Sequence, residues 1–257
     1  MLVKSLELKH KDLYPLFLTI VLVFSCTFLL NAQEHKKGET IFGLEVKGII
    51  PSTILNAGEQ SIGNDSIQVQ INSDYGFAFG MIIRHNFTKM FTLETGIHMT
   101  RRFYPIDVNN TKTSVQSSSK IEYISYEIPI QWLLYIRMTE HLYMNTILGT
   151  AFDIYPSDVI KVEDNYAYII QPKSWLQLSL LASVGFEYRT AKMGYFYFGA
   201  TIHRPFTEVA NLTLSYYEDP STPDFINFSG EISGTYLSLD LRYFFNKKEK
   251  KVEPKYY

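Results

Sequence analysis

Eight stretches of this chain alternate, residue by residue, between apolar side chains and small, polar or charged ones. A period of two is the pattern of a β-strand whose two faces meet different surroundings. The alternation covers residues 42–50, 75–84, 91–102, 124–137, 144–153, 176–189, 195–202 and 237–243. The pattern predicts an all-β fold of eight antiparallel strands.

The composition of the polar face indicates which face points inward. It is rich in small residues such as Gly76, Gly80, Gly149 and Gly185. Glycine weakens a strand that faces water, whereas a narrow eight-stranded barrel has room inside for small residues mixed with a few charged ones. A soluble lipocalin-like barrel would instead turn its apolar face inward. We therefore predict an up-and-down transmembrane β-barrel with its apolar face toward lipid.

The overall composition agrees with a membrane barrel. Aromatic residues make up 15% of the chain and charged residues only 19%, and such barrels carry aromatic girdles at both membrane interfaces. The net charge of −2 argues against nucleic acid as a partner. A mean hydropathy of −0.06 argues against a bundle of transmembrane helices.

The connections between the eight stretches alternate in length. Short connections at residues 86–90, 138–141 and 190–193 alternate with long ones at 51–74, 105–120, 156–174 and 205–234. Each long connection begins with Pro, which has no N–H for a sheet ladder and so suits the end of a strand. Outer-membrane barrels have short periplasmic turns and long outer loops. We therefore expect localisation in the outer membrane with both termini periplasmic.

The N-terminus has the composition of a secretory signal peptide. Lys4, Lys9 and Lys11 precede an apolar run over residues 16–30, and Ala32 follows it. This run is shorter than the roughly 20 residues of a spanning helix, although a retained anchor is the alternative. We predict a signal peptide (1–32), a periplasmic segment (33–39), the barrel (40–246) and a basic periplasmic tail (247–257).

The single cysteine, Cys26, lies within the apolar run. Lipidation at Cys26 is the alternative to its removal, but Phe24 is bulky for a lipoprotein signal. Cleavage after Ala32 would leave no cysteine, and therefore no disulfide or thiol chemistry.

Two segments carry a resemblance to a known family. Residues 126–130, with the following short turn and strand, and the aromatic ending at residues 234–245 resemble the small outer-membrane β-barrels of Bacteroidetes, the PorT-like group. The resemblance implies contact with the barrel-assembly machinery during biogenesis and a role as an accessory of a secretion or uptake complex. Pro129 within a predicted strand fits this group, but Pro is unusual in a central strand, and we therefore expect a bulge there.

Most of the charged residues in the predicted strands fall on the inward face. Because little water is present in a narrow lumen, we expect these acidic and basic side chains to pair with one another. Arg204 is also assigned to this face, and the predicted lumen charge network consists of Glu45, Lys47, Arg84, Glu94, His98, Arg102, Glu127, Arg137, Glu187, Arg189, Asp240 and Arg242. Our first interpretation is a salt-bridged plug. The alternative is a cationic periplasmic mouth for an anionic partner, formed by Arg84, Arg137, Arg189 and Arg242.

No motif predicts catalysis, a cofactor or a metal site. The sequence lacks HExxH, CxxC, a phosphate-binding glycine loop and an EF-hand pattern. A lipid-modifying enzyme of the outer leaflet would need a Ser, His and acid set, and neither His98 nor His203 has such neighbours in a characteristic spacing. We therefore predict that the chain is not an enzyme.

The long connections also contain apolar runs. One lies at residues 166–170, and the other, the candidate partner loop, contains Leu212, Leu214, Tyr216, Tyr217, Phe225 and Phe228. These runs are interpreted either as extended strands above the membrane or as a surface for an envelope protein partner. The predicted function is a structural or interaction role in the outer membrane, in contact with its lipid. The alternative is a narrow transport barrel for a small or apolar solute, and an enzyme is third.

Overall fold

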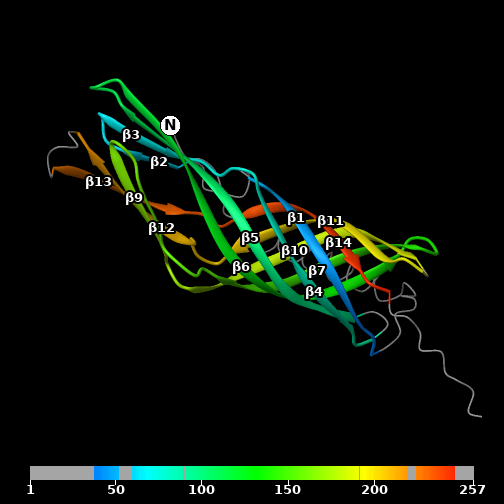
Figure 1. The fold of residues 1–257 in the computed structure, drawn as a ribbon. Coiled ribbons are helices and arrows are strands. Elements are labelled where there is room, and N and C mark those ends of the chain that lie inside the picture. The colour runs from blue at the N-terminus through cyan, green and yellow to red at the C-terminus, as the bar shows by residue number, and fades with distance from the viewer. Residues whose placement is uncertain (1–37, 52–59, 89–90, 191, 219–223, 247–257) are drawn as a thin grey trace, which may run out of the picture.

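The computed structural model describes residues 38–51, 60–88, 91–190, 192–218 and 224–246 (Figure 1). The predicted signal peptide and the basic tail lie outside these ranges. Within the described ranges no helix is long and apolar enough to cross a membrane.

Eight strands form the barrel. They are β1 (Thr40–Ile50), β4 (Gly76–Asn86), β5 (Phe91–Asn110), β6 (Val115–Arg137), β7 (Leu142–Ile154), β10 (Leu176–Thr190), β11 (Gly194–Pro205) and β14 (Tyr236–Phe244). Each barrel strand pairs antiparallel with the barrel strands before and after it in the chain. The first barrel strand, β1, pairs with the last, β14, and this pairing closes the ring. The predicted eight-stranded antiparallel barrel is confirmed.

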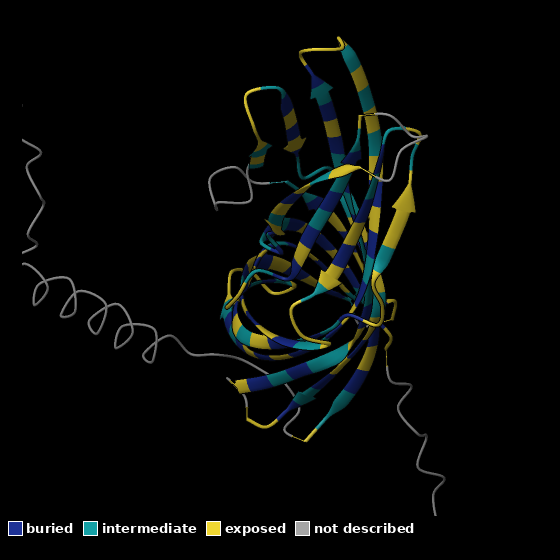
Figure 2. Ribbon diagram, turned by 90° about the vertical axis from the view of Figure 1, so that its left-hand side faces the viewer, coloured by how far each residue is buried: buried dark blue, intermediate teal, exposed yellow. Residues whose placement is uncertain are grey.

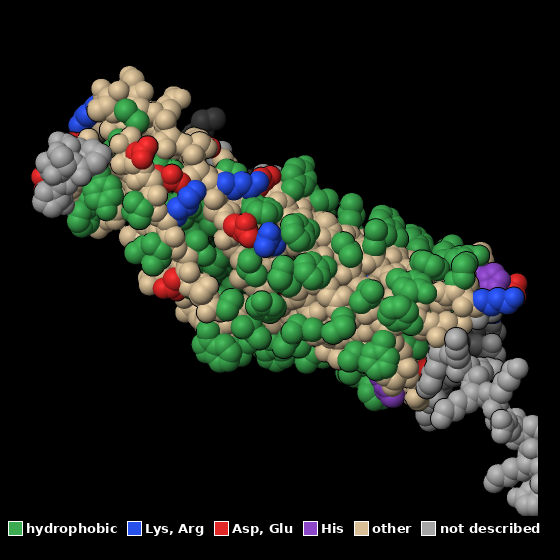
Figure 3. Space-filling model, viewed as in Figure 1, with side chains coloured by type: hydrophobic (Ala, Val, Ile, Leu, Met, Phe, Trp, Pro, Cys, Tyr) green, Lys and Arg blue, Asp and Glu red, His purple; other side chains and the backbone are tan. Residues whose placement is uncertain are grey.

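The two faces of the barrel wall are as predicted. In β1, Phe42, Leu44 and Val46 are exposed, while Glu45 and Lys47 between them are buried in the lumen. The same alternation of buried and exposed residues runs along the other strands (Figure 2). Exposed hydrophobic side chains from all eight barrel strands lie on the outside of the barrel, and we call them the apolar belt; Figure 3 shows one face of it.

Charged pairs mark one edge of the apolar belt. On the outer face of β5 and β6, Arg101 lies 3.0 Å from Glu122, and Lys120 lies 2.7 Å from Asp74. The hydrogen bond from Lys120 lowers the pKa of the Asp74 carboxyl group. The exposed Phe77 lies directly opposite Arg101, and exposed apolar residues such as Met81 and Ile97 lie on the barrel side of these pairs.

Pro129 does not cause the expected bulge. Thr95 lies opposite Ile130 and His98 opposite Glu127, so three steps along β5 match three steps along β6. On its other side, Pro129 stays in register with Ala151 of β7. The β5–β6 ladder is interrupted at this point, but its register is conserved, because Pro removes one donor and adds no residue.

The strands β5 and β6 continue beyond the apolar belt as a long hairpin that ends near Ser114 (Figure 1). The predicted loop at residues 105–120 is therefore wrong. Pro105 pairs with Lys120, and its carbonyl accepts a hydrogen bond from the Asn72 N–H at 3.0 Å. The strand continues because neighbouring strands satisfy the backbone groups that Pro still has.

The other long connections also form strands at this end of the barrel. β2 (Gln60–Gly63) and β3 (Ile67–Ile71) extend the β5–β6 hairpin into a sheet. A second sheet consists of β8 (Val159–Val162), β9 (Tyr166–Pro172), β12 (Ala210–Tyr217) and β13 (Phe225–Ile232). The second sheet has the order β13-β12-β9-β8. We call these two sheets the apical sheets. Both described ends of the chain lie at the opposite end, with the short turns.

A hydrophobic core joins the apical sheets. It contains Ile67, Val69, Ile106 and Val108 from the first sheet, and Tyr168 and residues of β12 from the second. The prediction of extended strands in the third and fourth long connections is confirmed, because apolar residues on alternate positions can be buried when two sheets pack face to face.

This packing corrects the interpretation of the candidate partner loop as a contact surface. Leu212, Leu214, Tyr216 and Phe228 are buried in the core between the apical sheets, Tyr217 is half-buried, and Phe225 is the one exposed residue of the six. The four buried residues are apolar because they form the core between the apical sheets, and they are therefore not available to a partner.

Candidate functional site in the barrel lumen

The lumen contains a continuous network of buried charged side chains. The structure places eleven of the twelve predicted network residues in it: Glu45, Lys47, Arg84, Glu94, His98, Arg102, Glu127, Glu187, Arg189, Asp240 and Arg242. They come from strands all around the ring, because every inward position of a narrow barrel faces the same axis.

The network begins near the short-turn end with Arg84. Its Nε donates to Glu94 at 2.8 Å, and its Nη1 donates to Glu187 at 2.5 Å. Arg189 donates to the other oxygen of Glu187 at 2.6 Å. The Arg84 guanidinium also lies 3.7 Å from the centre of the Phe244 ring. Each of these cations therefore has a carboxylate and an aromatic face as partners, which offsets part of the cost of burying it.

Arg242 connects this group to the middle of the barrel. Its Nη1 donates to Glu94, and its Nε donates to Glu45 at 2.6 Å. The Nε2 of His98 lies 2.7 Å from Glu45, and its Nδ1 lies 3.2 Å from Glu127. Ion-pair distances therefore connect the charged groups along the lumen without a break.

Inward tyrosines fill the space around these charges. The side chain of Tyr197 lies over Gly185 and Gly199, where an added Cβ would overlap its ring and hydroxyl. The Arg242 guanidinium lies 4.7 Å from the centre of the same ring. Small residues on the inward face are thus required where a large neighbouring side chain crosses the lumen.

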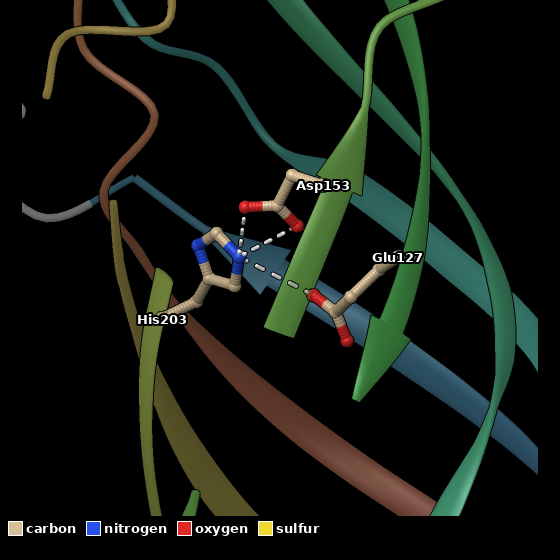
Figure 4. Close-up of side chains that lie close together, drawn as sticks. All are labelled: Glu127, Asp153 and His203. Atoms are coloured by element: carbon tan, nitrogen blue, oxygen red, sulfur yellow. Dashed lines mark hydrogen bonds and ion pairs between the residues drawn. The ribbon is translucent and has the colours of Figure 1, made fainter. Parts of the chain in front are cut away.

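Glu127, Asp153 and His203 form the part of the network nearest the apical sheets (Figure 4). The Nε2 of His203 lies 3.4 Å from Glu127 and 3.1 Å from Asp153. Lys47 and the Tyr236 hydroxyl each donate to Glu127 at 3.0 Å. The His203 ring stacks on Tyr236 with a centroid distance of 4.5 Å.

The chemistry of this group allows two uses. One ligand atom from each of the three residues lies within 4.8 Å of the others, and oxygen and imidazole ligands suit a divalent cation. In the geometry described, however, the His203 Nε2 already faces both carboxylates, and Ser179 donates to Asp153. The His203 Nε2 therefore bridges two acids, through a hydrogen bond to Asp153 and an ion-pair distance to Glu127, while its buried Nδ1 has no hydrogen-bond partner among the described residues.

Sequence reasoning missed Asp153 and His203 as members of the network. Asp153 was placed on the polar face but not counted among the lumen charges. His203 was placed just before the fourth long connection and not counted in the network, although it continues the inward series of Tyr197 and Thr201 in β11. The alternation of β11, extended by two residues, would have found His203.

Arg102 closes the lumen on the side of the apical sheets. Its Nη1 donates to the carbonyl of Gly234 at 3.0 Å, and its Nη2 donates to the Tyr155 hydroxyl at 3.2 Å. Its guanidinium also lies 5.9 Å from the ring centre of Tyr236. Among the described residues, no carboxylate lies within ion-pair distance of Arg102. It links the charged lumen to the tyrosines of the apical core.

Comparisons with known proteins concern the fold. The structure is similar to the crystal structure of the outer membrane protein OprG from Pseudomonas aeruginosa, with a TM-score of 0.52 and 12% identity, over 83% of this chain and 98% of that chain. The chain has the fold of an outer-membrane β-barrel protein. The outer membrane protease OmpT from Escherichia coli matches with a TM-score of 0.31 and 9% identity, over 80% of this chain and 96% of that chain, which is too weak a similarity to support a conclusion.

Comparisons at the sequence level give no match. No protein-family model matches the chain, and no curated protein is similar to it.

Two arginines predicted to face the lumen do not. Arg137 is exposed at the short-turn end, where its Nε donates to the Thr139 carbonyl at 3.1 Å. Arg204 points outward from β11, since it has the same parity as the exposed Ile202. The predicted cationic mouth is also wrong in its other members, because Arg84, Arg189 and Arg242 are buried against carboxylates.

Proposed function

We propose that this chain is an outer-membrane barrel with a closed lumen and a structural or interaction role. The single observation that carries the proposal is the unbroken series of buried ion pairs along the lumen, from Arg189 through Arg242 to Glu127. A solute would have to separate paired charges in a region with little water, and separating a buried pair costs several kcal/mol.

The apical sheets are the remaining part of the chain that can act outside the membrane. In this proposal the short-turn end and both termini face the periplasm, and the apical sheets face outward. The apolar belt supports the membrane location, since a soluble protein rarely exposes so extensive an apolar surface. The resemblance to the PorT-like barrels suggests an accessory role in a secretion or uptake complex, without an enzymatic activity.

Planar-bilayer recording with the purified, folded protein tests the closed lumen. We expect no reproducible conductance steps from the wild type. A double variant, Arg84→Ala with Arg242→Ala, removes the two guanidinium groups that link Glu45, Glu94 and Glu187. If it retains heat-modifiable migration on gels, it should conduct and so serve as the positive control.

Conductance steps from the wild type as large as those of the double variant would contradict the closed lumen and favour the narrow transport barrel.

Photo-crosslinking groups at exposed positions test the interaction role. A group at Ile160 on the apical sheets should capture protein in intact cells, whereas one at Val184 in the apolar belt should capture lipid only. Capture of lipid alone at both positions would leave no support for an interaction role of the apical sheets.

A further inference from the structure

A cavity of about 600 Å³ opens on the outer side of the molecule, where β11 ends and β14 begins. It is lined by Leu180, Arg204, Phe206, Glu208, Ser233 and Thr235, among others. It lies outside the lumen, and no residue of the lumen charge network lines it.

The cavity lies at the edge of the apolar belt. Arg204 pairs across the strands with Leu180, which is exposed in the belt, and Ile202 precedes it on the same face. Phe206 is also exposed, and its N–H donates to the Leu178 carbonyl at 3.1 Å. In the proposed membrane orientation, Ile202 faces acyl chains, while Leu180 and Arg204, which lie opposite each other, are at the edge of the apolar belt near the lipid headgroups.

Arg204 differs from the other outward-facing cations near this edge. Arg101, Lys120 and Lys173 lie 3.0, 2.7 and 2.6 Å from their carboxylate partners. Within the described part of the chain, no carboxylate lies within ion-pair distance of Arg204. An arginine at a membrane interface can be solvated by water alone, so a second feature of the cavity is needed to indicate a ligand.

That second feature is Glu208. Glu208 is half-buried, lines the cavity and has no ion-pair partner among the described residues; its Oε2 is enclosed and accepts no hydrogen bond from them. A buried carboxylate oxygen without a donor costs free energy, because it has lost its water. Since Glu208 and Arg204 line the same cavity but do not pair with each other, the cavity offers one cationic and one anionic group.

We propose that this cavity binds the headgroup of a membrane lipid that carries both a phosphate and a primary ammonium group, as phosphoethanolamine does. The planar guanidinium of Arg204 suits the phosphate. The carboxylate of Glu208 accepts a hydrogen bond from the ammonium, and the acyl chain lies along Leu180. The inference rests on the proposed membrane location. It is independent of whether the lumen is closed.

Native mass spectrometry of the delipidated protein in detergent tests this site. The protein is incubated with equal amounts of dioleoyl phosphatidylethanolamine, phosphatidylglycerol and phosphatidylcholine, and the lipids retained on each molecule are counted. We expect the wild type to retain phosphatidylethanolamine in preference to the other two. Arg204→Gln should lower its retention about tenfold, which corresponds to about 1.4 kcal/mol.

Glu208→Gln separates the two halves of the proposal. It should abolish the preference for phosphatidylethanolamine over phosphatidylglycerol, because only the ammonium contact is lost. Arg137→Gln is the matched control, since Arg137 is an exposed arginine at the opposite end of the barrel. Soluble phosphoethanolamine at millimolar concentration should not displace the lipid, because it lacks the acyl chain; displacement would assign the site to a soluble ligand and contradict the lipid.

Heat-modifiable migration and insertion into liposomes are measured for each protein. If the wild type inserts but Arg204→Gln retains as much phosphatidylethanolamine as Arg137→Gln, the proposed site is wrong. Equal retention of all three lipids by the wild type would contradict the ammonium contact. If the wild type does not insert at all, the proposed membrane function fails, and the site fails with it.

Discussion

Glu94 accepts hydrogen bonds from both Arg84 and Arg242, and so connects the two halves of the lumen network. All three side chains are buried. The carboxylate is therefore shared between two guanidinium groups that have no access to bulk water.

Replacing Glu94 tests how much the fold depends on this connection. We expect Glu94→Gln to lower the free energy of unfolding by about 3–5 kcal/mol, because two buried cations lose a charged partner. Glu122→Gln is the control, since the Arg101–Glu122 pair is partly exposed, and such pairs contribute about 0–1 kcal/mol. Urea unfolding of the barrel in detergent micelles measures both, and equal values would show that the lumen network contributes little to stability.

The apolar belt makes a prediction about membrane contact. Leu148 in β7 and Ile160 in β8 are 59% and 66% exposed. Leu148→Arg should cost about 2–4 kcal/mol and impair assembly, because lipid surrounds it. Ile160→Arg lies on the apical sheets and should change stability by no more than about 0.5 kcal/mol. Assembly yield and heat-modifiable migration compare the two, and equal tolerance would argue that water surrounds both.

The Tyr236 hydroxyl contributes to the arrangement of Glu127 and His203. Tyr236→Phe keeps the ring that stacks on His203 but removes the donor to Glu127. We expect a loss of about 1–3 kcal/mol, because a buried carboxylate oxygen loses a partner. Tyr243→Phe removes an exposed hydroxyl on the same strand, which donates to the Met193 carbonyl, and it should cost less. If Tyr243→Phe costs as much in thermal unfolding, burial is not the reason.

The apical sheets should unfold separately from the barrel when their core is damaged. Leu214→Ala removes a fully buried side chain from that core, and such substitutions cost about 2–5 kcal/mol. We expect faster proteolysis within β12 and β13, while heat-modifiable migration of the barrel is retained. Ser215→Ala changes an exposed residue of the same strand and should leave proteolysis unchanged. Loss of barrel migration in Leu214→Ala would show that the sheets and barrel fold as one unit.

The barrel was predictable because its signal is local. Alternation within single strands predicted all eight barrel strands and the orientation of residues such as Glu45 and Leu148. The lumen network followed from the same alternation. Arg204 was assigned to the wrong face, and His203 was left out of the network, because the pattern was not followed to the end of β11.

The apical sheets were harder to predict, because their pairing is not local. Residues of β9 pair with residues of β12 that lie 38 to 50 positions later, as Tyr168 does with Leu214. Their apolar side chains fit either a core or a contact surface, and only the partner strand decides between them. Pro105 added a misleading local signal, since its missing N–H indicated the end of a strand that continues through neighbouring pairings.

The hydrogen bond between Arg242 and Glu45 has a consequence for biogenesis. These residues are 197 positions apart, on the strands that close the ring. Until β14 takes its place, Glu45 lacks the guanidinium of Arg242, and the first and last strands both have an open edge. A chain that stops before β14 would therefore leave Glu45 and Glu94 without the Arg242 guanidinium and present unpaired backbone to the membrane, where both are costly. Membrane insertion is therefore more favourable for the chain that includes β14 than for a shorter one, because β14 supplies a partner for Glu45 and closes the ring.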